Sequence, residues 1–185
     1  MKVELIDKMG TDLSVVNAAR VSYAKEKEEF EESDERLIRY LAEHKHWSPF
    51  AHTFLSFRIK APVFVARQLV KHQVGLVWNE ESRRYITYDP EIYNIRKWRK
   101  KPDSSKQGSG EQILISTELN LEVNEHLQQG LKLYNRLLLE NVAPEQARAV
   151  LPQSMYTNWI WSGTCLLYTS PSPRDRSLSR MPSSA

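Results

Sequence analysis

The chain of 185 residues is long enough for one domain with a hydrophobic core, and its 41% hydrophobic and 26% charged residues are ordinary for a globular protein. A net charge of +3 is too small to indicate nucleic-acid binding, no apolar run reaches membrane-span length, and no signal-peptide pattern follows Met1, so we expect a cytoplasmic protein without nucleic-acid or membrane partners. The single cysteine, Cys165, excludes a disulfide framework and a cysteine-rich metal site.

The N-terminal part of the chain is predicted to begin with a strand and a helix. Residues 1–6 alternate loosely between apolar and polar side chains, which is typical of an edge strand. Asp12 is the predicted N-cap of a short helix that continues to Val21, because apolar side chains recur after it at helical spacing. The charged residues 24–33 predict a loop.

A second helix and a second strand follow this loop. Ser33 is the predicted N-cap of the helix, which ends near Glu43. The predicted buried stripe of this helix consists of Leu37, Ile38, Tyr40 and Leu41. Residues 53–61 alternate between polar and apolar side chains and predict a strand.

Three histidines lie between that helix and that strand, and they have two interpretations. His44, His46 and His52 suggest a metal site by their number alone. However, Pro49 breaks any helix between them, and no cysteine or acidic cluster completes a coordination sphere. We therefore predict no metal site and favour a polar loop that lines a pocket.

The stretch from Arg67 to Tyr85 concentrates groups that bind anions. Pro62 suits the first turn of a helix that reaches about Lys71, and on this helix Arg67 and Lys71 are neighbours one turn apart. Residues 85–88 then predict a strand. Two such cations usually mark a solvated basic face, but the rest of the helix is apolar and more polar groups follow, which favours a phosphate or nucleotide site.

The second half of the chain is predicted to be mainly helical, without an internal repeat or a second domain. Residues 94–113 are basic and then rich in serine and glycine, which predicts a surface loop. An RNA-binding patch at residues 96–106 is the sharper alternative. Residues 118–140 predict a long amphipathic helix, residues 144–152 a short helix ended by proline, and residues 155–161 a strand.

The composition changes abruptly at Cys165, since residues 165–185 are rich in serine, proline and arginine and show no periodicity. One interpretation is a disordered tail. We favour another, because codons that can encode this segment resemble a transposon end followed by sequencing adapters. The domain is then expected to comprise residues 1–164, and Arg174 and Arg176 receive no functional role. A long sequencing read of the source DNA across codon 164 tests this expectation.

The segment at residues 79–85 reads Asn-Glu-Glu-Ser-Arg-Arg-Tyr, and it resembles the central motif of flavin-dependent thymidylate synthases, asparagine-glutamate-x-serine-x-arginine-tyrosine. Further segments that resemble the family, in family order, are residues 12–14, 19–22, 60–68 and 147–152. The resemblance covers residues 1–164 nearly throughout. It implies an α+β fold, a single domain with a mainly antiparallel sheet flanked by helices, and a homotetramer with active sites shared between subunits.

The resemblance also implies an activity, the reductive methylation of dUMP to dTMP. Methylenetetrahydrofolate would donate the carbon, and FAD and NADPH would supply the reduction. The implied dUMP-binding residues are Gln68, Lys71, Glu80, Glu81, Ser82, Arg83, Arg84 and Arg148. The implied FAD-binding residues are Ser48, Lys71, His72, Gln73 and Glu80.

No residue of the retained part is assigned a catalytic role. The flavin carries the chemistry, so no protein nucleophile is required and Ser82 is expected to contact the substrate. The family's arginine that helps to ionise the pyrimidine lies beyond the Trp161 region, past the retained part. Arg84 and Arg148 are expected to bind the phosphate as planar guanidinium forks, with Arg148 reaching the site of a neighbouring subunit.

The chain departs from the family pattern at residues 71–73, where Lys-His-Gln replaces an arginine-histidine-arginine triplet. The loss of one charge-assisted hydrogen bond costs about 1.5–3 kcal/mol, so we expect flavin affinity to fall about 10- to 100-fold unless other contacts compensate. Eight residues rather than seven separate this triplet from Ser82, and a bulge near Gly75 is expected to absorb the extra residue. Trp78 either stacks on a ligand ring or packs as a core or interface aromatic.

Two alternative functions follow from these features. The altered triplet fits a flavin- or nucleotide-binding module that lacks synthase activity. The basic run at residues 96–106 fits an RNA-binding protein, which would show an affinity that falls steeply with salt.

Overall fold

The computed structural model describes residues 1–73, 75–86, 88–103 and 108–166. These residues form two compact units, each built from separate stretches of chain. Among the described residues, unit 1 comprises those within 1–60, 69–80 and 158–166, and unit 2 those within 61–68 and 81–157. The chain therefore passes from one unit to the other four times, and neither unit is a contiguous segment.

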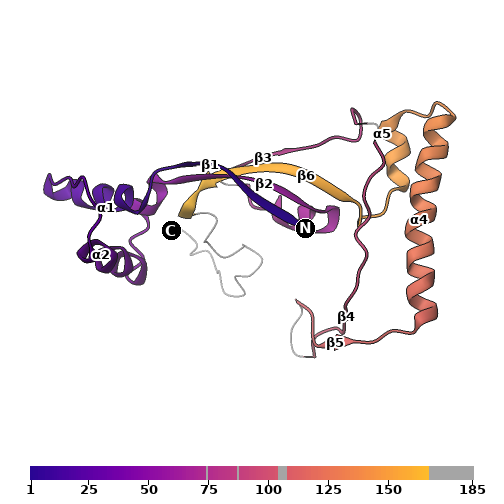
Figure 1. Cartoon of the computed structure of the whole chain (residues 1–185), viewed down its shortest axis with the longest axis horizontal. Coiled ribbons are helices and arrows are strands. Elements are labelled where there is room, and N and C mark those ends of the chain that lie inside the picture. Colours follow the sequence, from indigo (N-terminus) through magenta and orange to yellow (C-terminus); the bar gives the residue numbers. More distant parts are fainter. Residues whose placement is uncertain (74, 87, 104–107, 167–185) are drawn as a thin grey trace, which may run out of the picture. The chain divides into compact units, whose positions relative to one another are not determined.

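A four-stranded sheet lies mostly in unit 1 (Figure 1). Its strands are β1 (Lys2–Met9), β2 (Phe54–Pro62), β3 (Leu76–Glu80) and β6 (Tyr156–Thr164), in the order β1-β2-β6-β3. The pairs β1–β2 and β3–β6 are antiparallel. The three predicted strands at residues 1–6, 53–61 and 155–161 are confirmed, including the edge position of the first. The predicted strands include no counterpart of β3.

Tryptophan side chains of β3 and β6 form the centre of the unit 1 core. Trp159 is 2% exposed, and its ring stacks on Trp78 with 4.5 Å between the ring centroids. Trp161 meets Trp78 edge-on at 6.2 Å. Trp78 is thus a core aromatic. Gly163 allows the two strands to pack closely, since a Cβ there would lie 2.3 Å from the Leu76 side chain.

The helices of unit 1 begin slightly earlier than predicted. They are α1 (Asp12–Arg20) and α2 (Glu32–Glu43), with 3-10 turns at Val21–Tyr23 and Ser48–His52. Thr11 caps α1 and Glu31 caps α2, so the predicted caps Asp12 and Ser33 lie in the first turns. The cause is a reciprocal side-chain contact, in which the Thr11 amide donates to Ser14 Oγ and the Glu31 amide to Asp34 Oδ2, each at 3.0 Å.

The predicted buried stripe of α2 is confirmed only in part. Leu41 is buried and Leu37 and Ile38 are half-buried, but Tyr40 is 51% exposed. Its ring stacks on His44 with 4.0 Å between the centroids, and His44 Nδ1 lies 2.9 Å from the Tyr40 carbonyl oxygen. This contact keeps both rings at the surface.

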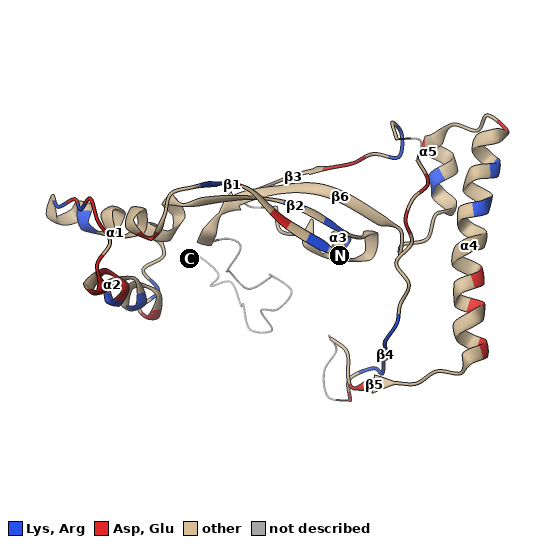
Figure 2. Ribbon diagram, in the orientation of Figure 1, with Lys and Arg blue, Asp and Glu red and all other residues tan. Residues whose placement is uncertain are grey.

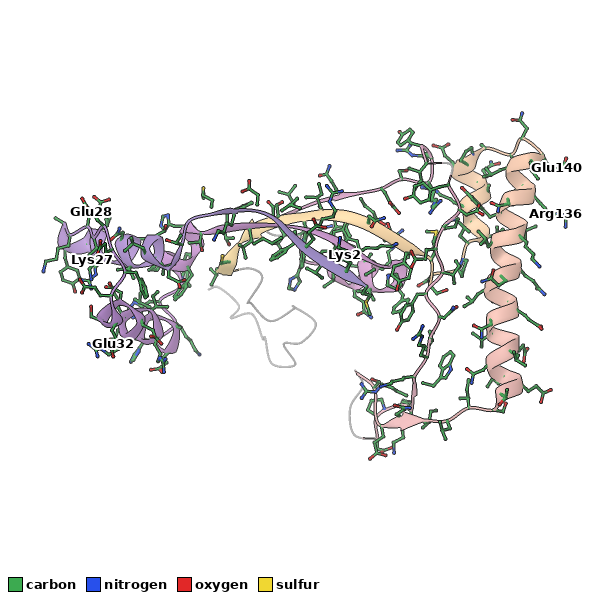
Figure 3. All side chains as sticks on the ribbon, viewed as in Figure 1. Lys2, Lys27, Glu28, Glu32, Arg136 and Glu140 are labelled. Carbon is green, nitrogen blue, oxygen red and sulfur yellow. The ribbon has the colours of Figure 1, made fainter. Side chains whose placement is uncertain are left out.

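A buried carboxylate, Asp34, ties α1, α2 and their connection together. Its side chain is fully buried, and Lys27 Nζ lies 2.7 Å from Oδ2 while Arg20 Nη2 lies 2.9 Å from Oδ1. Figure 3 labels Lys27 in the connection between the two helices. The hydrogen bond from Lys27, followed by that from the Glu31 amide, lowers the pKa of Asp34 to about 2. The charged form of Asp34 is therefore the form that the fold requires.

We expect this carboxylate to control stability in acid. Because its folded pKa lies below the unfolded value of about 3.9, its contribution is present above about pH 4 and is lost as the pH falls toward about 2. Urea unfolding of the wild type and of Asp34→Asn should show a stability difference that narrows over this window. Asp12→Asn, in the exposed first turn of α1, is the control. A difference that stays constant from about pH 6 to about pH 2.5 would contradict this role.

Unit 2 is built on a long helix and several shorter elements. These are α3 (Val63–Leu69, whose last residue belongs to unit 1), α4 (Thr117–Leu139), α5 (Pro144–Ala147), a 3-10 turn at Arg148–Val150, and the two-residue strands β4 (Trp98–Arg99) and β5 (Gln112–Ile113). The predicted long helix is confirmed, with Leu127 and Tyr134 as its buried residues. Gly130 lies against the 3-10 turn, since a Cβ there would lie 3.1 Å from the Val150 carbonyl oxygen.

Charge on α4 follows the direction of the helix. Acidic side chains gather in its N-terminal half and basic side chains in its C-terminal half (Figure 2). This distribution complements the helix dipole and stabilises the helix. Within the described ranges, no helix is both long enough and apolar enough to span a bilayer.

The remaining predictions concern connections and the C-terminal segment. The predicted strand at residues 85–88 is wrong, because residues 83–85 form a turn; residue 87 lies outside the described residues. The predicted loop at 94–113 contains the short β4–β5 pair, and residues 104–107 are not described. Of the segment 165–185, only Cys165 and Leu166 are described. The α+β class with an antiparallel sheet and flanking helices is confirmed.

Candidate functional site

The predicted site residues are distributed over both units. Unit 1 carries Ser48, Lys71, His72, Gln73 and Glu80, which are the residues implied for FAD. Unit 2 carries the remaining residues implied for dUMP, which are Gln68, Glu81, Ser82, Arg83, Arg84 and Arg148.

The Lys-His-Gln segment forms a turn after α3. The helix ends at Leu69, so Lys71 is not the helical neighbour of Arg67 that the sequence predicts. The His72 amide donates to the Leu69 carbonyl at 3.0 Å, which closes the turn. The side chain of Lys71 is exposed, while the buried Nε2 of His72 has no hydrogen-bond partner in the part of the chain that the structure describes. An orphaned ring nitrogen costs free energy unless a ligand completes it.

The turn then leads directly into β3. Gly75 has a φ of +69°, a conformation that glycine adopts without strain, and the Leu76 amide donates to the Gln73 carbonyl at 3.3 Å. The strand pairs regularly with β6 from Leu76 to Glu80. The strand itself contains no bulge, and the bulge near Gly75 that would absorb the extra spacer residue stays a prediction.

Glu80 ends β3 with an exposed carboxylate. The indole nitrogen of Trp78 donates to Glu80 Oε2 at 3.2 Å, so the core tryptophan also orients this acid. Ser48 is exposed as well, at the start of the 3-10 turn that follows α2. Exposed hydrogen-bonding groups at element ends are available to a ligand.

In unit 2, the described residues of the segment 81–88, here called the 81–88 loop, are tied together by hydrogen bonds. The Ser82 carbonyl accepts hydrogen bonds from the amides of Tyr85 at 2.9 Å and Ile86 at 3.3 Å. The Tyr88 hydroxyl donates to Glu81 Oε2 at 2.9 Å, which joins the two ends of the loop. The arrangement presents Ser82 and Arg84 from a turn that its own side chains hold together.

The two adjacent arginines of this loop have opposite environments. Arg83 is 5% exposed, its Nη1 donates to the Tyr88 carbonyl, and its guanidinium carbon lies 4.9 Å from the centroid of the Tyr88 ring. Arg84 is exposed and lies over the Tyr85 ring at 5.1 Å. Of the two, Arg84 therefore presents its guanidinium to solvent, where an anion can reach it.

Arg84 is oriented by a hydroxyl and a carboxylate. Its Nε lies 3.5 Å from Ser82 Oγ, and its Nη1 lies 3.3 Å from Glu145 Oε1. Glu145 belongs to α5, three residues before Arg148, whose side chain is exposed. The only signal for Glu145 in the sequence is its spacing from Arg148, which places both on one helical turn. An anion here would meet the Ser82 hydroxyl and the Arg84 guanidinium, and would compete with Glu145.

A hollow of about 450 Å³ also lies within unit 2, apart from the predicted residues. Its lining consists of Glu91, Ile92, Tyr93, Asn94, Arg96, Lys97 and Tyr156. The neighbouring basic run is partly neutralised, since Lys100 lies 3.6 Å from Asp103 and 3.4 Å from Glu111. These pairs lower the positive potential on which RNA binding by residues 96–106 would depend.

Comparison with known proteins matches almost the whole described chain to one family. Residues 4–168 match the family described as thymidylate synthase complementing protein. The flavin-dependent thymidylate synthase of Kosmotoga olearia is 42% identical over 164 residues, covering 86% of this chain and 70% of that protein. A protein of the same name from Thermus thermophilus is 41% identical over 159 residues, covering 86% of this chain and 58% of that protein.

One solved structure is similar to this chain in both fold and sequence. The UMP/dUMP methylase PolB from Streptomyces cacaoi, bound with 5-Br dUMP, matches with a TM-score of 0.72 and 35% identity. The match covers 88% of this chain and 72% of that one.

Proposed function

The chain belongs to the thymidylate synthase complementing protein family, and we propose that it catalyses the reductive methylation of dUMP to dTMP. Methylenetetrahydrofolate would donate the carbon, with FAD as the flavin and NADPH as the reductant. The observation that carries this proposal is the exposed Arg84 guanidinium beside Ser82, in a chain whose structural relative is a UMP/dUMP methylase. A phosphate there would gain a charge-assisted, planar donor pair.

The nucleotide would be held mainly by unit 2. Arg84 and Arg148 would bind the phosphate, with Arg148 contributed to the site of a neighbouring subunit. Ser82, Gln68 and the carboxylates of Glu80 and Glu81 would supply directional contacts to the sugar and the uracil ring. Lys71 is a further proposed contact of dUMP, and it would add a charge. For Arg83, the burial of its side chain supports a contact through the backbone alone.

The flavin would be held by the turn after α3. Its residues fit a polar ring edge and a pyrophosphate, because His72 Nε2 is buried without a partner in the described residues while Lys71 and Gln73 are exposed. Ser48 and Glu80 would add hydrogen bonds. When bound, the flavin would supply the redox chemistry, and these residues would orient it and neutralise its charge.

We propose a homotetramer as the working assembly. Each unit exposes large apolar side chains of the kind that a protein interface covers. In unit 1 these include Val3, Leu5 and Met9 of β1, and in unit 2 they include Leu114, Leu121 and Leu139. Multi-angle light scattering at micromolar concentration tests the assembly.

The release of tritium from carbon 5 of labelled dUMP tests the activity. Flavin-loaded protein should release it when methylenetetrahydrofolate and NADPH are present, and dTMP should form in equal amount. Protein that binds FAD and dUMP yet releases no tritium would instead support the alternative, a binding module without synthase activity.

Replacing Glu145 with glutamine is expected to tighten dUMP binding. The carboxylate holds Arg84 by an exposed ion pair at 3.3 Å, and such pairs contribute about 0.2–1 kcal/mol. Its removal should lower the Kd of dUMP by about 1.4-fold to fivefold, as measured by titration calorimetry. Glu125→Gln on α4 is the charge-matched control. A weaker affinity in Glu145→Gln would show that this carboxylate aims Arg84 and does not compete with the phosphate.

A further inference from the structure

Arg83 is an unusual residue in the 81–88 loop because its charge is buried. It occupies one of the two variable positions of the motif at residues 79–85, and the resemblance implies only that it binds dUMP, without a role for its side chain. At 5% exposure its guanidinium has left water, which is costly for a charge without compensating contacts. The contacts that it makes therefore indicate what the buried charge does.

Those contacts all lead to Tyr88. Nη1 of Arg83 donates to the Tyr88 carbonyl, and the guanidinium lies over the Tyr88 ring at 4.9 Å. No ion pair of Arg83 and no partner for its Nε occur among the described residues. A lysine has neither the planar fork nor the flat face that this double contact uses. Arg83 is thus bound to the far end of its own loop.

Tyr88 in turn is fastened to the start of the loop. Its hydroxyl donates to Glu81 Oε2 at 2.9 Å. Arg83 and Glu81 therefore both hold Tyr88. Ser82 and Arg84 lie in the stretch of chain between Glu81 and Tyr88. The fixed backbone also sets the position of the Arg84 amide, 3.3 Å from Ser82 Oγ.

We propose that Arg83 is a positioning residue, whose buried guanidinium fixes the 81–88 loop through Tyr88 so that Ser82 and Arg84 are arranged in advance for a nucleotide phosphate. This inference rests on the proposed function, since it assigns the phosphate to Arg84. Preorganisation of this kind increases affinity because the loop need not be ordered when the ligand binds. The Arg83 side chain acts through Arg84 and does not itself touch the nucleotide.

A double-mutant cycle between the two arginines tests the proposal. The Kd of dUMP is measured for flavin-loaded wild type, Arg83→Lys, Arg84→Ala and the double variant. Arg83→Lys should raise the Kd about three- to tenfold while kcat at saturating dUMP stays within about twofold. In the Arg84→Ala background, Arg83→Lys should raise the Kd of dUMP by less than about twofold, because the effect of Arg83 passes through Arg84.

Two outcomes overturn the proposal. One is an affinity of Arg83→Lys for dUMP that equals that of the wild type. The other is a loss of affinity from Arg83→Lys that is as large in the Arg84→Ala background as in the wild type. Should Arg83→Lys not fold, Tyr88→Leu replaces it, since that change removes the ring and the hydroxyl while Arg83 remains. Tyr88→Leu should show the same coupling to Arg84. If Arg84→Ala alone leaves the Kd unchanged, the phosphate assignment fails instead, which separates the two hypotheses.

Discussion

Replacing Arg84 with alanine is expected to raise the Kd of dUMP about 10- to 100-fold. The side chain is exposed, lies beside Ser82 and is held by an exposed ion pair with Glu145 that a phosphate can displace. Loss of a charge-assisted hydrogen bond costs about 1.5–3 kcal/mol, which corresponds to one to two decades in affinity. Titration calorimetry on flavin-loaded protein measures the change directly.

Two controls show whether the loss comes from the phosphate contact. Deoxyuridine has no phosphate, so its weaker binding should be the same in the wild type and in Arg84→Ala. Arg36→Ala on the exposed face of α2 removes one positive charge elsewhere and should leave the Kd of dUMP within about twofold. An equal loss for both ligands would place Arg84 at the ring or sugar and contradict the phosphate assignment.

Replacing Trp159 with alanine is expected to lower the free energy of unfolding by about 3–5 kcal/mol. The side chain is 2% exposed at the centre of β6, and its ring stacks on Trp78 at 4.5 Å. Alanine would leave a cavity that the paired strands cannot close, and would also remove the aromatic contact. Urea unfolding followed by circular dichroism measures the loss.

Trp47→Ala is the matched control because Trp47 also lies in unit 1 but is 63% exposed. Its effect should stay within about 0.5 kcal/mol. The comparison removes the same side chain from both sites, so burial is the difference that matters. Similar losses in the two variants would mean that Trp159 is not at the centre of the core.

Periodic patterns predicted the large elements correctly. The repeat of leucines along residues 118–140 predicts α4, and alternation at 53–61 predicts β2, because in both cases one face of the element is apolar. Helix starts were predicted less well. The choice of Thr11 over Asp12, and of Glu31 over Ser33, depends on side-chain hydrogen bonds that close only in three dimensions.

Errors occurred where distant contacts override local preference. β3 lies in a segment dominated by polar chemistry, and it becomes a strand because Trp78 and its neighbours pair with β6, about eighty residues later. Conversely, residues 85–88 have strand-like composition, but residues 83–85 form a turn, and Arg83 and Glu81 both bond to Tyr88.

In the candidate site, too, the sequence identifies the segment but not the environment of its side chains. The motif identifies the right segment, yet two adjacent arginines look equivalent in sequence. Burial distinguishes Arg83 from Arg84, and it depends on the position of Tyr88. The role of Glu145 was missed because its partner lies 61 positions away and exposed ion pairs leave no pattern in a single sequence.

The strand order has a consequence for how the chain folds during synthesis. Of the four strands of this sheet, β6 is the last to leave the ribosome, yet it lies between β2 and β3. Until residues 156–164 emerge, β2 and β3 have no common neighbour, and the apolar faces of the unfinished sheet remain uncovered. Such long-range pairing slows folding and leaves the nascent chain prone to aggregation. Chaperones that protect nascent chains should therefore matter most for this protein late in translation.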